Sequence, residues 1–211
     1  MSRPRLLDLF CGAGGAAAGY AAAGFEVVGV DIRPMPRFPY EFHEADALTY
    51  PLAGFDVIHA SPPCQRYSKS VSRRARATRP DLIAPIRDRL RASGRLYVIE
   101  NVPGAPLLDP VTLCGSSFGL GVRRHRRFES CALIFGQPCR HDAYEPQYAP
   151  AWNRSTPLRF RPISGGWTAD SDHELDAAAM GITHPMSPRE LSESIPPAYT
   201  EWIGRQLIGR L

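Results

Sequence analysis

The sequence predicts an α/β protein in which a parallel sheet is covered by helices on both faces. Apolar, strand-like runs alternate with helical segments through the first half of the chain. Glycine-rich turns separate several of these segments. The 211 residues are enough for one domain with a substantial hydrophobic core. Together these observations indicate repeated strand–helix–strand units, which build parallel sheets.

The predicted elements have clear boundaries in the first half of the chain. Each strand is a short apolar run bounded by charge, glycine or proline; the predicted strands are residues 5–10, 25–31, 55–61 and 95–101, and a further strand is expected to end near Asp46. An alanine-rich helix over residues 16–24 ends at Gly24, a suitable C-cap. A second helix covers residues 80–93, where Pro85 is expected to kink or shorten it.

The second half of the chain has a different character. Prolines recur between residues 131 and 188 and clear periodicity is lost, so we expect a loop-rich insertion there. The last stretch, residues 195–211, regains helical spacing with its apolar side chains on one face. We expect this helix to pack back onto the sheet.

Charge is modest in total but unevenly distributed. The net charge is +4, and of the 25 basic residues all but Lys69 are arginine. Two clusters stand out, Lys69 to Arg79 and Arg123 to Arg127. Arginine forks pair bidentately with phosphates and base edges, although a solvated face is the commoner fate of a charge run. The chain has no apolar run of about 18 residues and no signal-peptide pattern, so we expect a cytoplasmic protein.

The five cysteines do not form a disulfide framework. Their number is odd and no CxxC pair occurs. Cys139 and His141 are spaced to supply two metal ligands, with Cys131 or His173 as a further one. Because no second ligand pair is recognisable, we assign no metal site and leave open whether Cys139 and His141 bind one.

The stretch SPPCQRYS, residues 61–68, places a cysteine directly behind two prolines. Pro62 and Pro63 fix the backbone and end the preceding strand. Cys64 is therefore held at a strand end with little freedom, as a nucleophile needs to be. A buried apolar thiol is the alternative, since this is the usual fate of a free cysteine.

Two further strand ends carry chemically useful groups. The turn CGAGG lets the backbone approach a ligand at a helix N-terminus, and Asp31 lies where a carboxylate can accept hydrogen bonds from ribose hydroxyls. Asp46 can accept from an adenine amino group, or simply cap a turn. Glu100 follows another apolar strand, and ligands bind at the carboxyl ends of such strands. A salt-bridge or cap role is the alternative for Glu100, but the three strand ends together favour one site.

The motifs DLFCGAGGAAAGY, SPPCQRYS, IENVPG and RRHRRF resemble, in order and spacing, the DNA (cytosine-5) methyltransferase family. The short chain and the ending IPPAYTEWIG look most like its compact phage and prophage members. The resemblance covers residues 5–130 and 190–205. It implies a Rossmann-like sheet that binds S-adenosylmethionine (AdoMet), formed by residues 1–130 and 189–211. It implies a short target-recognition region at residues 131–188.

The resemblance also implies roles for individual residues. Catalytic roles fall to Cys64, Glu100, Arg124 and Arg126. AdoMet is expected to contact Phe10, Cys11, Gly12, Gly14, Asp31, Ile32, Asp46 and Pro62. The nucleic acid is expected to contact Gln65, Ser68, Arg73, Arg74, Arg76 and Asn101. The segment Lys69 to Arg79 is interpreted as a mobile loop that clamps phosphates, with a solvated linker as its alternative.

The implied reaction is methyl transfer to C5 of cytosine in double-stranded DNA by a monomeric enzyme. Thiolate addition at C6 would activate C5, and the cytosine would have to be flipped out of the duplex. Two positions depart from the family pattern: Val122 replaces the usual Gln, and Glu193 replaces the usual Asn. Glu193 leaves the cofactor contacts at that corner open and disfavours a carboxylated AdoMet.

Two alternatives remain open, an RNA (tRNA) cytosine-5 methyltransferase and a catalytically silent homologue that binds DNA or AdoMet. The presence of Cys64, Glu100 and Arg126 argues against the silent homologue. The insertion is small, which favours a short recognition site. Neither the recognition sequence nor the biological role follows from the residues.

Overall fold

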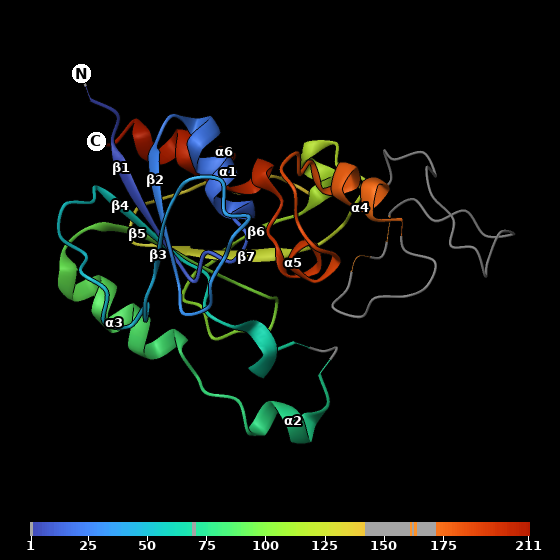
Figure 1. Cartoon of the computed structure of the whole chain (residues 1–211), viewed down its shortest axis with the longest axis horizontal. Helices are drawn as coiled ribbons and strands as arrows, with labels where there is room; N and C mark the ends of the chain where they lie inside the picture. The colour runs from blue at the N-terminus through green and yellow to red at the C-terminus, as the bar shows by residue number, and fades with distance from the viewer. Residues whose placement is uncertain (1, 69–70, 142–160, 162, 164–171) are drawn as a thin grey trace, which may run out of the picture.

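A seven-stranded mixed sheet forms the centre of the computed structural model (Figure 1), which describes residues 2–68, 71–141, 161, 163 and 172–211. The strand order is β3-β2-β1-β4-β5-β7-β6. The strands are β1 Arg5–Leu9, β2 Glu26–Asp31, β3 Glu41–Glu44, β4 Val57–Ala60, β5 Leu96–Asn101, β6 Val111–Leu113 and β7 Arg126–Ser130. The four strands predicted with bounds are all present, and β3 ends two residues before Asp46.

The strand order reverses beside β1, and this creates the place where a ligand can bind. The chain runs outward from β1 through β2 to β3, and then crosses back to place β4 on the other side of β1. The two connections leave β1 in opposite directions, so a crevice opens at the carboxyl ends of β1 and β4. The glycine turn follows β1 and the Pro62 loop follows β4, so both border this crevice.

Helices cover both faces of the sheet, as predicted. One face carries α1, Gly15–Ala23, and α6, Pro197–Ile208, and the other carries α3, Ile83–Ser93 (Figure 1). Tyr20 and Tyr199 are fully buried in the first layer, and Ile86 and Leu90 in the second. The sheet is thus buried on both sides, which explains the near-continuous apolar runs of its central strands.

The C-terminal helix packs very closely on α1. A Cβ atom added to Gly19 would lie 2.0 Å from the carbonyl oxygen of Pro197, so only glycine allows this approach. The Thr200 hydroxyl donates to the carbonyl of Ala16 at 2.8 Å across the same contact. The prediction that the last helix returns to the sheet is therefore confirmed.

The strands predicted from the first half of the chain are parallel, as expected, and the structure adds elements that the sequence did not predict. β7 is antiparallel to both β5 and β6, so the sheet is mixed at this edge. Short helical elements also appear: η1 Cys64–Arg66, α2 Arg73–Ala77, η2 Gly115–Phe118, α4 His173–Met180 and α5 Pro188–Glu193. The helix predicted at residue 80 begins at Ile83.

The predicted target-recognition region, residues 131–188, is attached to the sheet domain at both of its ends. Ile134 belongs to the core beneath α6, and Met180 and Met186 pack with Ala13 and Val122. Residues 142–160, 162 and 164–171 lie outside the described part of the chain. The boundaries of this region stay a prediction. Within the part of the chain that the structure describes, no helix is long and apolar enough to cross a membrane.

A buried ion pair joins α3 to the antiparallel edge of the sheet. Arg87 donates to both carboxylate oxygens of Glu129 at 2.8 Å, and also to the carbonyl of Pro106 at 2.7 Å. The backbone N–H of Leu108 donates to Glu129 at 2.8 Å. The side chain of Glu129 is only 3% exposed, so its charge is removed from water and depends on these partners.

We expect Glu129→Gln to lower the free energy of unfolding by about 3–5 kcal/mol, because the buried Arg87 would lose its counter-ion. The matched control is Glu201→Gln, which breaks the exposed pair between Glu201 and Arg205 on α6 and should cost at most about 1 kcal/mol. Equilibrium chemical denaturation measures both. Equal losses in the two variants would contradict the structural importance of the buried pair.

Candidate active site

Cys64 and Glu100 follow neighbouring parallel strands at the sheet crevice. Ala60 pairs with Ile99, so the loop after β4 and Glu100 in β5 emerge side by side. Asn101 donates its side-chain amide to the carbonyl of Pro62 at 2.8 Å, which fixes the loop before Cys64. The carbonyl of Cys64 itself accepts from the backbone N–H of Tyr67, at 2.9 Å. The half-buried thiol is therefore held from both sides, as the prolines predicted.

The role of Asn101 differs from the prediction. It is only 1% exposed, and its side-chain oxygen also accepts from the N–H of Val102 at 2.9 Å. With both ends of the amide engaged inside the protein, Asn101 cannot contact a nucleic acid. It is a positioning residue for the Pro62 loop.

Arg126 completes the group around the thiol. It begins β7, whose antiparallel register with β5 pairs Arg127 with Asn101. The guanidinium Nε lies 3.2 Å from Oε1 of Glu100, and both side chains are largely buried. The structure thus brings together three of the four predicted catalytic residues.

Arg124, to which the resemblance gives a catalytic role, is engaged with backbone carbonyls in the structure. Its guanidinium donates to the backbone carbonyls of Ser194, Ile163 and Ser192 at 2.9, 3.1 and 2.5 Å. Its backbone has a φ of 30°, in the left-handed region that non-glycine residues rarely adopt. Because three carbonyls hold it, Arg124 ties the loop before β7 to residues 192–194, and Arg126 is the arginine that pairs with Glu100.

Burial and charge act in opposite directions on the thiol and the carboxyl. Burial raises the pKa of Cys64, Arg126 and Arg124 lower it, and Glu100 raises it. Burial also raises the pKa of Glu100, against the lowering effect of Arg126 and Arg124. The site therefore holds a thiol that Arg126 helps to ionise, beside a carboxyl group that is easier to protonate than an exposed one. This combination suits nucleophilic attack with proton donation to the same substrate.

A buried polar chain behind Glu100 was missed by the sequence reasoning. The hydroxyl of Tyr20 lies 3.0 Å from Nδ1 of His59, Nε2 of His59 lies 2.7 Å from the Ser61 hydroxyl, and Ser61 hydrogen-bonds Glu100. Burial lowers the pKa of His59 to about 3, so the ring is neutral. The consistent assignment is that Tyr20 donates to Nδ1, Nε2–H donates to Ser61, and Ser61 donates to the carboxylate. The sequence feature that could have indicated this chain is the histidine inside the apolar run VIHA.

The glycine turn forms an open cradle next to Asp31. Phe10, Gly12 and Gly14 all have positive φ values, of 59°, 51° and 91°. Among the described residues, no atom lies within 4 Å of where a Cβ on Gly12 would be, so the space above it is open. The N–H of Gly12 donates to Oδ2 of Asp31 at 3.1 Å. The structure therefore links the turn to Asp31, and the contact of Asp31 with a ribose stays a prediction.

The other predicted cofactor residues surround this cradle with mixed exposure. Ile32 is 69% exposed, which is unusual for an isoleucine and leaves an apolar surface beside Asp31. Cys11 and Pro62 are buried, and their contacts with AdoMet stay a prediction. Asp46 accepts from the N–H of Leu48 at 2.9 Å and so caps a turn, and its contact with the adenine stays a prediction.

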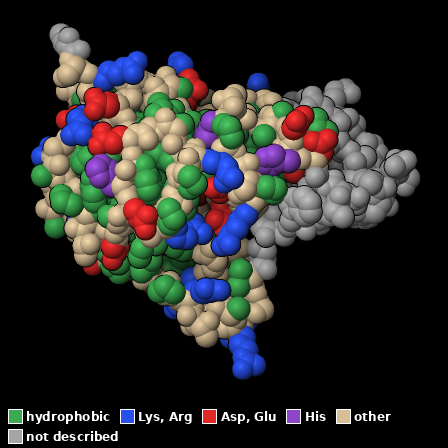
Figure 2. Space-filling model, in the orientation of Figure 1, with side chains coloured by type: hydrophobic (Ala, Val, Ile, Leu, Met, Phe, Trp, Pro, Cys, Tyr) green, Lys and Arg blue, Asp and Glu red, His purple; other side chains and the backbone are tan. Residues whose placement is uncertain are grey.

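The predicted nucleic-acid residues lie on an exposed extension of the site. Gln65 belongs to η1 and Ser68 follows it. Arg73 and Arg74 are exposed on α2, a short helix capped by Ser72 and projecting from the sheet domain, and Arg76 is half-buried (Figure 1). Lys and Arg side chains gather between the centre of this face and its projecting lower tip (Figure 2). The segment is thus partly helical rather than a plain loop; Lys69 and Ser70 lie outside the described residues.

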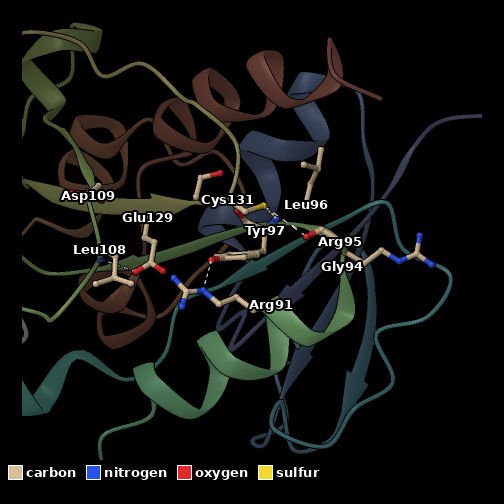
Figure 3. A pocket seen from close by; sticks show the side chains of 10 residues that line it. Arg91, Gly94, Arg95, Leu96, Tyr97, Leu108, Asp109, Glu129 and Cys131 are labelled. Atoms are coloured by element: carbon tan, nitrogen blue, oxygen red, sulfur yellow. Dashed lines mark hydrogen bonds between the residues drawn. The ribbon is translucent and has the colours of Figure 1, made fainter.

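A surface hollow at the opposite end of β5 is not part of this site. It is lined by residues that include Arg91, Tyr97, Leu108 and Glu129 (Figure 3). Several of its polar groups already have partners: Arg91 donates to the Tyr97 hydroxyl, and Glu129 accepts from Arg87 and from the N–H of Leu108. The hollow lies near the amino-terminal end of β5, whereas Glu100 and the Cys64 loop lie at the carboxyl ends of β5 and β4.

The charges around Cys64 predict two opposite shifts of its pKa. Arg126→Ala should raise the pKa of Cys64 further, and Glu100→Gln should lower it, because the first removes a positive neighbour and the second a negative one. The measurement is the rate of Cys64 alkylation against pH, followed by peptide mass spectrometry to separate it from the other cysteines. The wild-type midpoint should lie above that of a free thiol. Shifts in the same direction for both variants would contradict this arrangement.

Comparison with known proteins finds likeness in structure but not in sequence. No protein-family model and no curated protein matches the chain. The Dnmt2 methyltransferase of S. pombe is 15% identical, with 99% of each chain aligned and a TM-score of 0.68. The methyltransferase EhMeth of Entamoeba histolytica is 12% identical, with 100% of this chain and 99% of that chain aligned and a TM-score of 0.59.

A third structure, a mutant of Spodoptera frugiperda DNMT2, aligns only in part. It is 17% identical over 60% of this chain and 49% of that chain, with a TM-score of 0.45, which is too low to bear on the fold. The two full-length alignments and the mixed sheet indicate the same fold. The chain has the Rossmann-like α/β fold of AdoMet-dependent methyltransferases.

Proposed function

We propose that this protein transfers a methyl group from AdoMet to C5 of cytosine in double-stranded DNA. The observation that carries the proposal is the grouping of Cys64, Glu100 and Arg126 at the ends of neighbouring strands. The open glycine turn borders the same crevice. A nucleophile, a proton donor and a cation beside a cofactor cradle are the parts that this reaction requires.

The residues of the chain account for the activation of a base that is otherwise unreactive. C5 of cytosine is a weak nucleophile. The Cys64 thiolate adds to C6 and forms a carbon–sulfur bond, while Glu100 donates a proton to N3 and the electron pair becomes available at C5. AdoMet, when bound, supplies the methyl group that C5 takes up. Loss of the C5 proton to a base then re-forms the C5–C6 double bond and expels the Cys64 thiolate. N3 returns its proton to Glu100, and the demethylated cofactor leaves as S-adenosylhomocysteine, which restores the enzyme.

Arg126 and the buried chain behind Glu100 prepare these two groups. Arg126 lowers the pKa of Cys64 and so favours the thiolate that attacks. It also pairs with Glu100 at 3.2 Å, which keeps that carboxyl group directed at the position of the base. Ser61 and His59 hold Glu100 from behind, so its orientation is fixed before the substrate arrives.

The cradle fits AdoMet on the chemistry of its donors and its open space. Asp31 accepts from the N–H groups of Gly12 and Arg33, at 3.1 and 3.0 Å. A carboxylate has about four acceptor positions, so it retains capacity for ribose hydroxyls. The exposed Ile32 offers an apolar surface to an adenine ring. Phe10, Gly12, Gly14 and Asp46 complete the predicted set around these two residues.

Double-stranded DNA is the proposed substrate, with the protein acting as a monomer and the cytosine flipped into the crevice. The exposed arginines of α2 support a polyanionic partner, since the helix projects from the domain beside the Cys64 loop. RNA carries the same phosphates, and the protein groups described here would activate a cytosine in either polymer. The experiment must therefore compare both.

The test is covalent trapping on 5-fluorocytosine, in which the C5 position has no proton to lose. With AdoMet present, wild-type protein should form a denaturation-resistant adduct with duplex DNA that contains this base, and more slowly or not at all with a structured RNA. Cys64→Ala should form none. Cys131→Ala is the matched control, because Cys131 is exposed and lies at the amino-terminal end of β5, away from Glu100.

Three outcomes would overturn the proposal in different ways. An adduct in Cys64→Ala would remove the assigned nucleophile. An adduct with RNA but not with DNA would establish the RNA alternative. AdoMet or DNA binding by the wild type, with no adduct on either polymer, would establish the silent homologue.

The arginines of α2 predict a specific dependence of DNA binding on salt. Each neutralised phosphate contributes about −0.9 to the slope of log K against log salt. Replacing Arg73, Arg74 and Arg76 by alanine should therefore flatten the slope by about 2 to 3, similarly for all sequences, and leave AdoMet affinity unchanged. Fluorescence anisotropy at several salt concentrations gives both slopes.

A charge-matched control separates contact from net charge. Alanine at Arg3, Arg91 and Arg95 removes the same charge from exposed positions at the amino-terminal ends of β1 and β5. This variant should keep the wild-type slope. If both triple variants flatten the slope equally, α2 makes no phosphate contacts and the linker interpretation of this segment holds.

A further inference from the structure

Four side chains with metal-ligand atoms meet beside the active site, at the antiparallel edge of the sheet. They are Cys114, His125, Cys139 and His141, and their sulfur and nitrogen ligand atoms all lie within 4.8 Å of one another. Sγ of Cys114 is 3.2 Å from Nε2 of His141, and Sγ of Cys139 is 3.4 Å from Nε2 of His125. The two imidazole rings are nearly perpendicular, with their centroids 5.2 Å apart.

We propose that these four residues bind a structural zinc ion. Zinc takes thiolate sulfur at about 2.3 Å and imidazole nitrogen at about 2.0–2.1 Å, so a tetrahedral site has sulfur–nitrogen separations of about 3.5 Å. The two observed separations, 3.2 and 3.4 Å, are close to that value. Four protein ligands leave no open position, which is typical of a structural site rather than a catalytic one.

The backbone brings the four ligands together through contacts that do not involve the ligand atoms. Cys114 directly follows β6 and His125 directly precedes β7, and these strands pair with Leu113 opposite Arg126. Cys114 and His125 are therefore neighbours at the end of an antiparallel ladder. This places one sulfur and one nitrogen at a fixed position on the sheet edge.

The second ligand pair is delivered by the chain that follows β7. The hydroxyl of Ser116 accepts from the N–H of Arg140 at 3.0 Å, and the hydroxyl of Ser117 donates to the carbonyl of Pro138 at 2.8 Å. These two bonds hold residues 138–140 against η2, immediately after Cys114. Cys139 and His141 are consequently arranged around the first pair before any ion enters.

The chemistry of the four ligands selects among metals. Thiolate and imidazole suit zinc, whereas magnesium and calcium require oxygen ligands, and the cluster contains no carboxylate. Zinc binding would deprotonate both thiols and release two protons to solvent. Two thiolates then balance the 2+ ion. The site is electrically neutral, which suits a loop that also carries Arg123, Arg124 and Arg126.

This set corrects the partners considered from the sequence. Cys139 and His141 were paired there with Cys131 or His173. Cys131 instead lies beside β5, where its sulfur accepts from the N–H of Tyr97 at 3.2 Å, and His173 begins α4. Cys114 and His125 are widely separated in sequence from each other and from Cys139, so no spacing motif marked them.

The position of the site gives the ion a role in shaping the active centre. His125 lies between Arg124, which binds the carbonyls before α6, and Arg126, which pairs with Glu100. A metal bond to His125 would therefore fix the backbone from which both arginines project. His125 acts in this way as a positioning residue, while the chemistry stays with Cys64 and Glu100.

The test begins with the metal content of the full-length protein, purified without chelators and measured by plasma mass spectrometry. We expect one zinc per chain, lost in Cys139→Ser, a substitution at an exposed position that should not disturb the core. Cys131→Ser, at another exposed cysteine outside the cluster, should keep the metal. Cobalt added to metal-free protein should give the intense visible bands of a tetrahedral site with thiolate ligands, and His141→Asn should weaken them.

The proposal would be overturned by any of three results. The first is a wild type that takes up no zinc or cobalt when titrated after reduction. The second is a disulfide between Cys114 and Cys139 that non-reducing peptide mapping finds and that persists in cells. The third is loss of the metal from Cys131→Ser as complete as the loss from Cys139→Ser. None of these measurements requires methyl transfer, so they stand apart from the test of the proposed function.

Discussion

The ion pair between Glu100 and Arg126 connects the two parts of the sheet from which the site is built. Glu100 comes from the parallel part, next to the Pro62 loop, and Arg126 from the antiparallel hairpin that closes the edge. Because both groups are largely buried, neither charge is stable without the other. The pairing therefore forces the hairpin to sit where its arginine can also act on Cys64. The geometry of the thiol, the carboxyl and the cation follows from this one constraint.

Burial is the second physical factor in the site, and it makes the polar groups behind Glu100 necessary. A carboxyl group removed from water has a raised pKa and loses its orientation unless other groups hydrogen-bond to it. Ser61 and the neutral ring of His59 supply that support, and Tyr20 anchors the chain in the α1 layer. Asp8 is fully buried on β1, the strand next to that of His59. Burial raises the pKa of Asp8 well above the usual range, which favours its neutral form. The layer beneath the site is therefore polar but carries little charge.

Three interactions act on the same short loop, where the chain enters β7. Arg124 is bound by the carbonyls before α6, Arg126 is bound by Glu100, and the side chain of His125 between them faces the proposed zinc ligands. A loop fixed at three successive residues has few alternative conformations, and this lowers the reorganisation needed when a substrate binds. The described part of the chain has no large accessory domain, so these local contacts are what keep the loop rigid.

The sequence alone determined the features that depend on local patterns. Apolar runs with flanking glycine and proline marked the central strands, and helical spacing marked the last helix. The same local signals located the Gly12 turn, the Pro62–Cys64 loop and Glu100, because each follows a strand whose end can be recognised. Parallel strands then bring their carboxyl ends to one edge, so the grouping of Cys64 and Glu100 also followed from the sequence.

Only the tertiary structure decided the features that depend on pairing between distant segments. β6 and β7 are three and five residues long, too short for a clear periodic signal, and their antiparallel pairing places Cys114 beside His125. The inward direction of Asn101 and the attachment of Arg124 to residues 192–194 likewise depend on what lies across the contact. A residue's type fixes which partners it can accept, but non-local packing determines which of them is within reach. For this reason the proposed nucleophile was visible in the sequence and the proposed zinc site was not.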